Sequence, residues 1–164
     1  MLAGCGVALV TLWAPTSVRA QRPPDPLASV EASDPLELGR RAAALGDDAV
    51  LARLGDATPA LVRLAAIRAA RMLRQPERAL VPLARIARGR DPDLGPAAML
   101  AISRIVAAFD LPMLERRELR AEDFADVRRA LAALAGDGRA RADVRAVARR
   151  AARRLEALLG PASP

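Results

Sequence analysis

Two twelve-residue segments of this chain repeat each other without a gap. Residues 62–73 read VRLAAIRAARML, and residues 144–155 read VRAVARRAARRL. The copies share the opening Val-Arg, an Ala at the fifth position, an Arg-Ala-Ala-Arg run and the final Leu. Self-similarity of this kind on helix-forming residues is typical of a chain built from copies of one helical unit. Because such units bury their apolar faces only against each other, the repeat predicts a stacked helical architecture.

The composition excludes most catalytic chemistry. The 164 residues include no His, no Tyr and no Lys, so all 26 basic side chains are arginines. Without His the chain lacks the usual proton shuttle and an imidazole metal ligand, and without Lys it cannot form a Schiff base. Cys5 is the only thiol, so the chain has neither a disulfide framework nor a cysteine zinc site. We therefore expect no enzyme activity, metal, cofactor or small-molecule substrate.

Alanine dominates the apolar residues, and this favours closely packed helices. The hydrophobic fraction is 52%, whereas aromatic residues make up only 2%. Ala is the best helix former and lets helix axes approach, so we expect an all-α fold rather than a β-sandwich or barrel. Cap signals such as Asp34-Pro35 and Gly46 mark helix ends. They predict helices at about 35–45, 48–54, 59–73, 79–88, 96–109, 121–135 and 140–159, with an inserted loop or helical turn at 110–120.

The N-terminal residues have the pattern of an export signal. Residues 2–14 are uncharged, largely apolar and too few to span a bilayer, and residues 18–20 end in the small-residue pattern that signal peptidase reads. This predicts an exported, periplasmic protein. Two alternatives use the same residues. The tetrapeptide LAGC at 2–5 fits the bacterial lipobox, which would lipidate Cys5 and anchor the protein to a membrane, and a buried helix would suit a cytosolic protein.

We expect four segments along the chain. A signal peptide or lipoprotein leader at 1–20 is followed by a Pro-rich linker at 21–34, because four prolines between 23 and 35 favour a semi-rigid spacer. A helical repeat domain at 35–160 and a short tail at 161–164 complete the chain.

A longer pattern surrounds the first copy of the repeat. Gly55-Asp56 precedes Val62-Arg63, alanine pairs follow, and the next helix contains Val81-Pro82-Leu83. These features resemble the HEAT-repeat family, specifically its short bacterial repeats. The resemblance covers about residues 36–109 and returns at 137–159 with Asp137 and Val144-Arg145. It departs at the helix over 121–135, and Gly95-Pro96 replaces Val-Arg in the middle copy.

The resemblance implies an armadillo-type α solenoid, a right-handed α-α superhelix of about three to four helical hairpins. The hairpins would be 35–54, 59–88 and 96–135, followed by an unpaired last helix. In the family the turn Asp and the Val-Arg arginine form a polar ladder between units. The resemblance therefore implies pairs of Asp56 with Arg63 and of Asp137 with Arg145, as charge-assisted hydrogen bonds with a structural role.

The resemblance also implies a function: a non-catalytic protein-interaction or scaffold module. Solenoids bind through a continuous surface, usually the concave one lined by the second helix of each hairpin. Here those helices fall near 48–54, 78–88 and 121–135. Their exposed arginines would make an electropositive groove for a protein with an acidic surface: Arg53, Arg85, Arg88, Arg128 and Arg129.

Two alternative functions remain open. The last helix carries seven arginines between 139 and 154 opposite an apolar stripe, which would suit a basic module for anionic membranes or nucleic acid. Nucleic acid is the weaker partner, because no Tyr or His and only two Phe are present to stack on bases. A HEAT-like lyase or DNA glycosylase is weaker still, since those enzymes place aromatic side chains against a lesion.

Acidic residues gather at the expected helix starts. Asp47-Asp48, Asp91 with Asp93, and Glu122-Asp123 each precede or open a helix. Carboxylates there cap free N–H groups and meet the positive end of the helix dipole. We therefore expect helix capping rather than metal binding from these groups.

Overall fold

The computed structural model of the protein describes residues 25–28, 34–89 and 91–160. These residues form helices and connecting turns without any strand, which confirms the all-α prediction. The elements are α1 (Pro35–Leu45), α2 (Asp47–Ala52), α3 (Ala60–Ala69), η1 (Ala70–Met72), η2 (Pro76–Ala79), α4 (Leu80–Arg88), α5 (Leu94–Ala107), α6 (Leu111–Arg116), η3 (Ala121–Phe124), α7 (Ala125–Gly136) and α8 (Ala142–Leu159).

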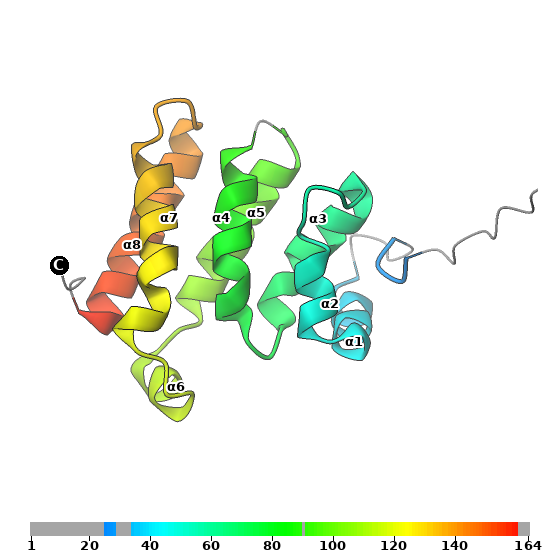
Figure 1. The fold of residues 1–164 in the computed structure, drawn as a ribbon, viewed down its shortest axis with the longest axis horizontal. Coiled ribbons are helices and arrows are strands. Elements are labelled where there is room, and N and C mark those ends of the chain that lie inside the picture. The colour runs from blue at the N-terminus through cyan, green and yellow to red at the C-terminus, as the bar shows by residue number, and fades with distance from the viewer. Residues whose placement is uncertain (1–24, 29–33, 90, 161–164) are drawn as a thin grey trace, which may run out of the picture.

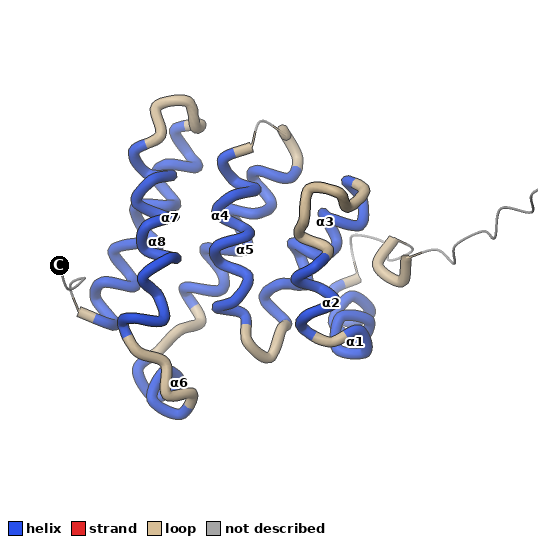
Figure 2. Tube along the Cα trace, in the orientation of Figure 1, coloured by secondary structure: helices blue, strands red, loops and turns tan. Residues whose placement is uncertain are grey.

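The helices form two layers (Figure 1). One layer, here called the A layer, contains α1, α3, α5 and α8, each of which contacts the next. The other, the B layer, contains α2, α4 and α7, and α4 packs along α7. Chain order therefore runs from one end of the molecule to the other, with α6 and the turns around it at one edge (Figure 2).

The closest helix pairs differ from the predicted hairpins. α4 packs most extensively against α5, and α7 against α8, whereas the predicted partners α3 and α4 touch far less. The tightest contacts thus cross the expected boundaries at 59–88 and 96–135, and α8 has a full partner rather than standing alone. Helix caps and periodicity are local signals, so they predict where helices begin and end but not which neighbouring helix each helix packs against.

The caps explain where the first helices begin and end. Asp34 Oδ1 accepts the backbone N–H groups of Leu36 and Glu37, both at 3.0 Å, and Pro35 occupies the first turn. Gly46 ends α1 with a φ of 81°, a left-handed conformation that favours glycine. Pro82 lies in the first turn of α4, where its missing N–H breaks no helical hydrogen bond.

The two acidic residues at the start of α2 bond to residues about thirty positions later in the chain and do not cap their own helix. Asp47 accepts the backbone N–H groups of Arg74 and Gln75 at 3.2 and 2.9 Å, and Asp48 pairs with Arg78 at 2.7 Å. The expectation of capping was wrong for this pair, because the turn between η1 and η2 brings unsatisfied N–H groups to the same carboxylate. Asp91 and Asp123 do accept N–H groups at helix starts.

The repeat is visible in the core as a repeated burial pattern. In α3 with η1 the buried positions include 62, 66, 69 and 73, and in α8 they are 144, 148, 151 and 155. α5 buries 95, 99, 102 and 106 at the same spacing, and also 94, 98, 101 and 105. Small residues lie at buried positions of both copies: Ala66 and Ala148 are both fully buried. The two copies of the repeat thus present equivalent faces to the core, whereas α5, which lacks the Val-Arg opening, is buried over a wider face.

Residues 110–120 contain the short helix α6, where the sequence predicts an inserted loop or helical turn. Asp110 caps α6 by accepting the N–H of Met113 at 2.7 Å. The rings of Phe109 and Phe124 meet edge to face, with centroids 5.6 Å apart, and so join the end of α5 to the start of α7. This insertion links the two best-packed helix pairs.

Candidate functional site

The turn before α3 holds one of the two expected ladder pairs. Arg63 lies 2.5 Å from Asp56, and its Nε donates to the carbonyl oxygen of Leu54 at 3.1 Å. The Arg63 side chain is only 15% exposed, so these bonds fix its position. Both partners belong to the turn between α2 and α3, and the arginine therefore stabilises that turn.

The second expected pair does not form. Asp137 lies 3.5 Å from Arg88 of α4 instead, and Arg145 donates to the carbonyl oxygen of Ala140. Arg63 and Arg145 thus make equivalent hydrogen bonds, because each donates to a backbone carbonyl oxygen of the preceding turn. The aspartates of the two turns differ, since Asp56 pairs with Arg63 and Asp137 pairs with Arg88. A hollow of about 530 Å³ beside Asp137 is also lined by Asp91 and three arginines, so its charges are partly balanced.

Most of the arginines predicted to bind a partner are held by the protein itself. Arg53 donates to Asp25 at 2.8 Å and to the carbonyl oxygen of Ala49 at 2.7 Å. Arg128 is partly buried and donates to the carbonyl oxygen of Gly160 at 2.8 Å, which ties α7 to the end of α8. These two arginines therefore stabilise the fold.

The other three predicted arginines lie at the surface. Arg88 pairs with Asp137, and Arg129 pairs with Asp126 of its own helix. Arg85 is exposed and lines a hollow of about 280 Å³ that Asp56 also lines. The B layer consequently has much less unbalanced positive charge than the sequence predicts.

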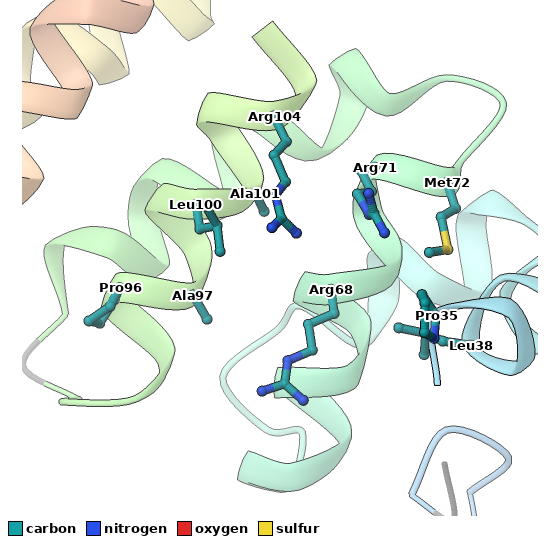
Figure 3. Close-up of a pocket in the computed structure, with 10 residues that line it drawn as sticks. All are labelled: Pro35, Leu38, Arg68, Arg71, Met72, Pro96, Ala97, Leu100, Ala101 and Arg104. Atoms are coloured by element: carbon teal, nitrogen blue, oxygen red, sulfur yellow. The ribbon is translucent and has the colours of Figure 1, made fainter. Parts of the chain in front are cut away.

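A different hollow, on the A layer, collects arginines without carboxylates. It measures about 530 Å³ and lies between α1, α3, η1 and α5. Figure 3 shows Arg68, Arg71 and Arg104 reaching over it from α3, η1 and α5. The remaining lining is apolar and consists of Pro35, Leu38, Met72, Pro96, Ala97, Leu100 and Ala101.

The hollow continues along α5 as a groove. A second hollow of about 370 Å³ shares Arg71, Met72 and Arg104 with the first and extends to Ala108. We call the two together the arginine groove. From residue 96 to residue 108 it follows α5 for roughly 18 Å, at the helical rise of about 1.5 Å per residue. Leu100 is 52% exposed, so the groove opens to solvent and is not an enclosed cavity.

Two arginines of the groove have no acidic partner among the described residues. Neither Arg71 nor Arg104 forms an ion pair with any residue that the structure describes. A guanidinium beside apolar surface binds a carboxylate or phosphate through paired N–H donors, while the apolar floor accepts a hydrophobic group. Sequence reasoning missed these residues because the groove joins segments from 35 to 108. The available signal was Arg68 and Arg71, three residues apart on one helical face.

The last helix is basic on its outer side, as the sequence predicts, but part of its charge is used internally. Arg141 pairs with Asp143 at 3.0 Å, and Arg154 donates to the carbonyl oxygen of Phe109 at 3.2 Å. The exposed arginines of α8 with neither an ion pair nor a side-chain hydrogen bond among the described residues are Arg149, Arg150 and Arg153.

Three carboxyls in the turns have lowered pKa values. The backbone N–H of Leu94 donates to Asp91 and lowers the pKa of that carboxyl, and the N–H of Arg139 does the same for Asp137, with Arg88 adding to the effect. The Arg141 side chain lowers the pKa of Asp143. These shifts follow from bonds that hold the turns, so they report structure and not a reactive group.

The predicted leader lies outside the described residues, as does Cys5. None of the helices in ranges 34–89 and 91–160 has the length and apolar character of a membrane span. In the same ranges, no three His, Cys, Asp or Glu side chains lie close enough together to hold a metal ion. No protein-family model, curated protein or solved structure matches the chain.

Proposed function

We propose that this protein is a non-catalytic helical-repeat module that binds an acidic protein partner through the arginine groove. One observation carries the proposal: the described residues that line the groove are three arginines and apolar side chains, with no carboxylate among them. Arginine and exposed apolar surface together are typical of the parts of interfaces that contribute most to affinity. The open shape favours a protein segment over a small ligand, because small-molecule sites enclose most of the ligand surface.

The proposal includes the HEAT-like right-handed superhelix as the architecture that presents this groove. The burial pattern common to the two copies of the repeat supports it, because repeated units meet the core with equivalent faces. Export to the periplasm, with a cleaved leader at 1–20, belongs to the same proposal. Lipidation at Cys5 is its alternative.

The groove replaces the B-layer surface as the proposed binding site. On the B layer Arg53 and Arg128 are already hydrogen-bonded within the fold, and an incoming carboxylate would have to displace those partners. Arg71 and Arg104 need no such exchange, since no described carboxylate holds them. An acidic partner therefore gains more from the A layer.

A photo-crosslinking experiment in the native cell tests the proposal. A benzoylphenylalanine replaces Leu100 in the groove, and a matched probe replaces Ala132, which is exposed on α7 of the other layer. The Leu100 probe should capture a protein at an acidic stretch of its sequence, and the Ala132 probe should not. Reversing both groove charges, with Arg71→Glu and Arg104→Glu, should abolish that crosslink.

The control reverses two charges on the other layer, with Arg85→Glu and Arg129→Glu. Both residues are exposed, and neither lines the arginine groove. This control should leave the Leu100 crosslink intact. If only the control variant lost the crosslink, the binding site would lie on the B layer and the proposal would be wrong. A crosslinked stretch without acidic residues would contradict the proposed partner class.

The basic face of α8 supports a second candidate, binding to an anionic membrane surface. Arg149, Arg150 and Arg153 are exposed there without a described acidic partner. A vesicle-binding signal that falls steeply with salt and disappears in Arg149→Glu with Arg150→Glu would favour this candidate.

A further inference from the structure

Three arginines follow buried residues at the same sequence intervals in three neighbouring segments of the A layer. Arg71 follows the buried positions 62, 66 and 69 by nine, five and two residues. Arg104 follows 95, 99 and 102 by the same intervals, and Arg153 follows 144, 148 and 151. Arg71 and Arg153 close the same Arg-Ala-Ala-Arg run in the two copies of the repeat, and Arg104 lines the groove beside Arg71. All three are exposed.

The groove and one hydrogen bond place these arginines around the C-terminal end of α5. Arg71 and Arg104 line both hollows of the arginine groove, so they face each other across the contact between α3 and α5. Arg154 donates to the carbonyl oxygen of Phe109, which places the turn of α8 next to Arg153 beside the end of α5. We call Arg71, Arg104 and Arg153 the arginine row.

The row is positive along its whole length. No described carboxylate forms an ion pair with any of its three members. The residues that follow Arg71 and Arg104 are the apolar Met72 and Ile105, and the residue that follows Arg153, Arg154, donates to the carbonyl oxygen of Phe109. A linear acidic ligand fits this geometry better than a broad, flat surface.

Resting on the proposed function, we propose that the partner segment lies in the polyproline II conformation across η1, α5 and α8. In this arrangement an acidic side chain at every third position pairs in turn with Arg71, Arg104 and Arg153. Packed helix axes are about 8–10 Å apart, and one three-residue turn of polyproline II spans about 9 Å with side chains three apart on the same face, so the two periods agree. An apolar residue between the first two acids would lie over the groove floor near Leu100.

Two fluorescein-labelled peptides of equal composition test this spacing by fluorescence anisotropy at low salt. The spaced peptide is Glu-Leu-Ser-Glu-Ser-Ser-Glu, and the clustered peptide is Glu-Glu-Glu-Leu-Ser-Ser-Ser. The spaced peptide should bind about tenfold more tightly, because only it reaches all three arginines at once. In separate variants, Arg71→Gln, Arg104→Gln and Arg153→Gln should each weaken its binding by roughly three- to fivefold.

Arg85→Gln is the matched control. It removes one exposed arginine from α4 of the B layer without touching the row, so it should change the affinity less than twofold, as estimated for a distant screened charge. A loss equal to that of Arg153→Gln would show general charge attraction and overturn the proposal. Circular dichroism checks that all four variants keep the helical content of the full chain.

The outcomes separate this inference from the proposed function. In one outcome Arg71→Gln and Arg104→Gln weaken binding, while Arg153→Gln and the peptide spacing have no effect. The groove then binds acidic segments without Arg153, so the inference fails and the proposed function stands. If no row variant has an effect, or neither peptide binds, both proposals fail. If phosphatidylglycerol vesicles bind the chain and the spaced peptide does not displace them, the surface meets a membrane and the inference is overturned.

Discussion

At the scale of single residues, arginine has two different roles in this protein. Arg53, Arg63 and Arg128 are largely covered and bond to carbonyl oxygens or carboxylates of the fold. Arg71 and Arg104 are exposed beside apolar surface and pair with no described acid. A sequence without lysine cannot separate these groups by residue type, so the surroundings of each guanidinium decide its role.

Arg63 provides the clearest test of a structural arginine. Replacing it with Met keeps the apolar part of the side chain but removes the bonds to Asp56 and to the carbonyl oxygen of Leu54. The free energy of unfolding should fall by about 1–2 kcal/mol, measured by urea denaturation. Arg150→Ala, at an exposed site, should change it by less than about 0.5 kcal/mol. Equal changes in both variants would contradict the assigned role.

The lowered pKa values of Asp91, Asp137 and Asp143 predict a loss of stability in acid. A carboxyl whose pKa is lower when folded contributes stability above its unfolded pKa of about 3.9, and loses that contribution as the pH falls through the folded pKa. Thermal melts should therefore show a decline that begins below about pH 5. Asp91→Ala should be less stable than the unchanged protein at pH 7, and the two curves should converge toward pH 3. Parallel curves would contradict the assignment.

At the scale of the elements, local chemistry predicted most helices but not their contacts. Asp34 and Gly46 mark helix ends by bonds within four residues, so their sequence signals were readable. Phe124, Val127, Leu131 and Leu134 recur at helical spacing within the helix predicted over 121–135, and all four are buried. The pairing of α4 with α5 depends on how side chains from distant segments fit together, and no local pattern encodes that fit.

The repeated burial pattern makes a packing prediction. Ala69 is fully buried where α3 meets the core, whereas Ala146 is exposed on α8. Ala69→Leu should lower the free energy of unfolding by about 1–3 kcal/mol, because three extra carbons overpack the contact. Ala146→Leu adds the same atoms at the surface and should have little effect. Comparable melting temperatures for the two variants would argue against these faces.

At the scale of the whole molecule, the candidate site arises only when the layers assemble. Its arginines come from residues 68, 71 and 104, and its floor extends back to Pro35 and Leu38 of α1. The prediction of an acidic partner followed from the arginines of the second helix of each hairpin and stays a prediction. The sequence placed the binding site on the B layer, because it does not reveal that Arg53 and Arg128 bond to Asp25 and to the carbonyl oxygen of Gly160. Contacts across the fold decide which charges are left for a partner.

The central claim is that the A layer, through its arginines, receives an acidic segment. The most direct test is a two-dimensional ¹H–¹⁵N NMR titration of the full chain with the peptide Glu-Leu-Ser-Glu-Ser-Ser-Glu. The account predicts that the largest shift changes fall on backbone amides around Arg71, Leu100 and Arg104, with small changes at Arg85 and Arg129 on the B layer. Changes concentrated at Arg85 and Arg129, or confined to Arg149 and Arg150 on α8, would contradict it.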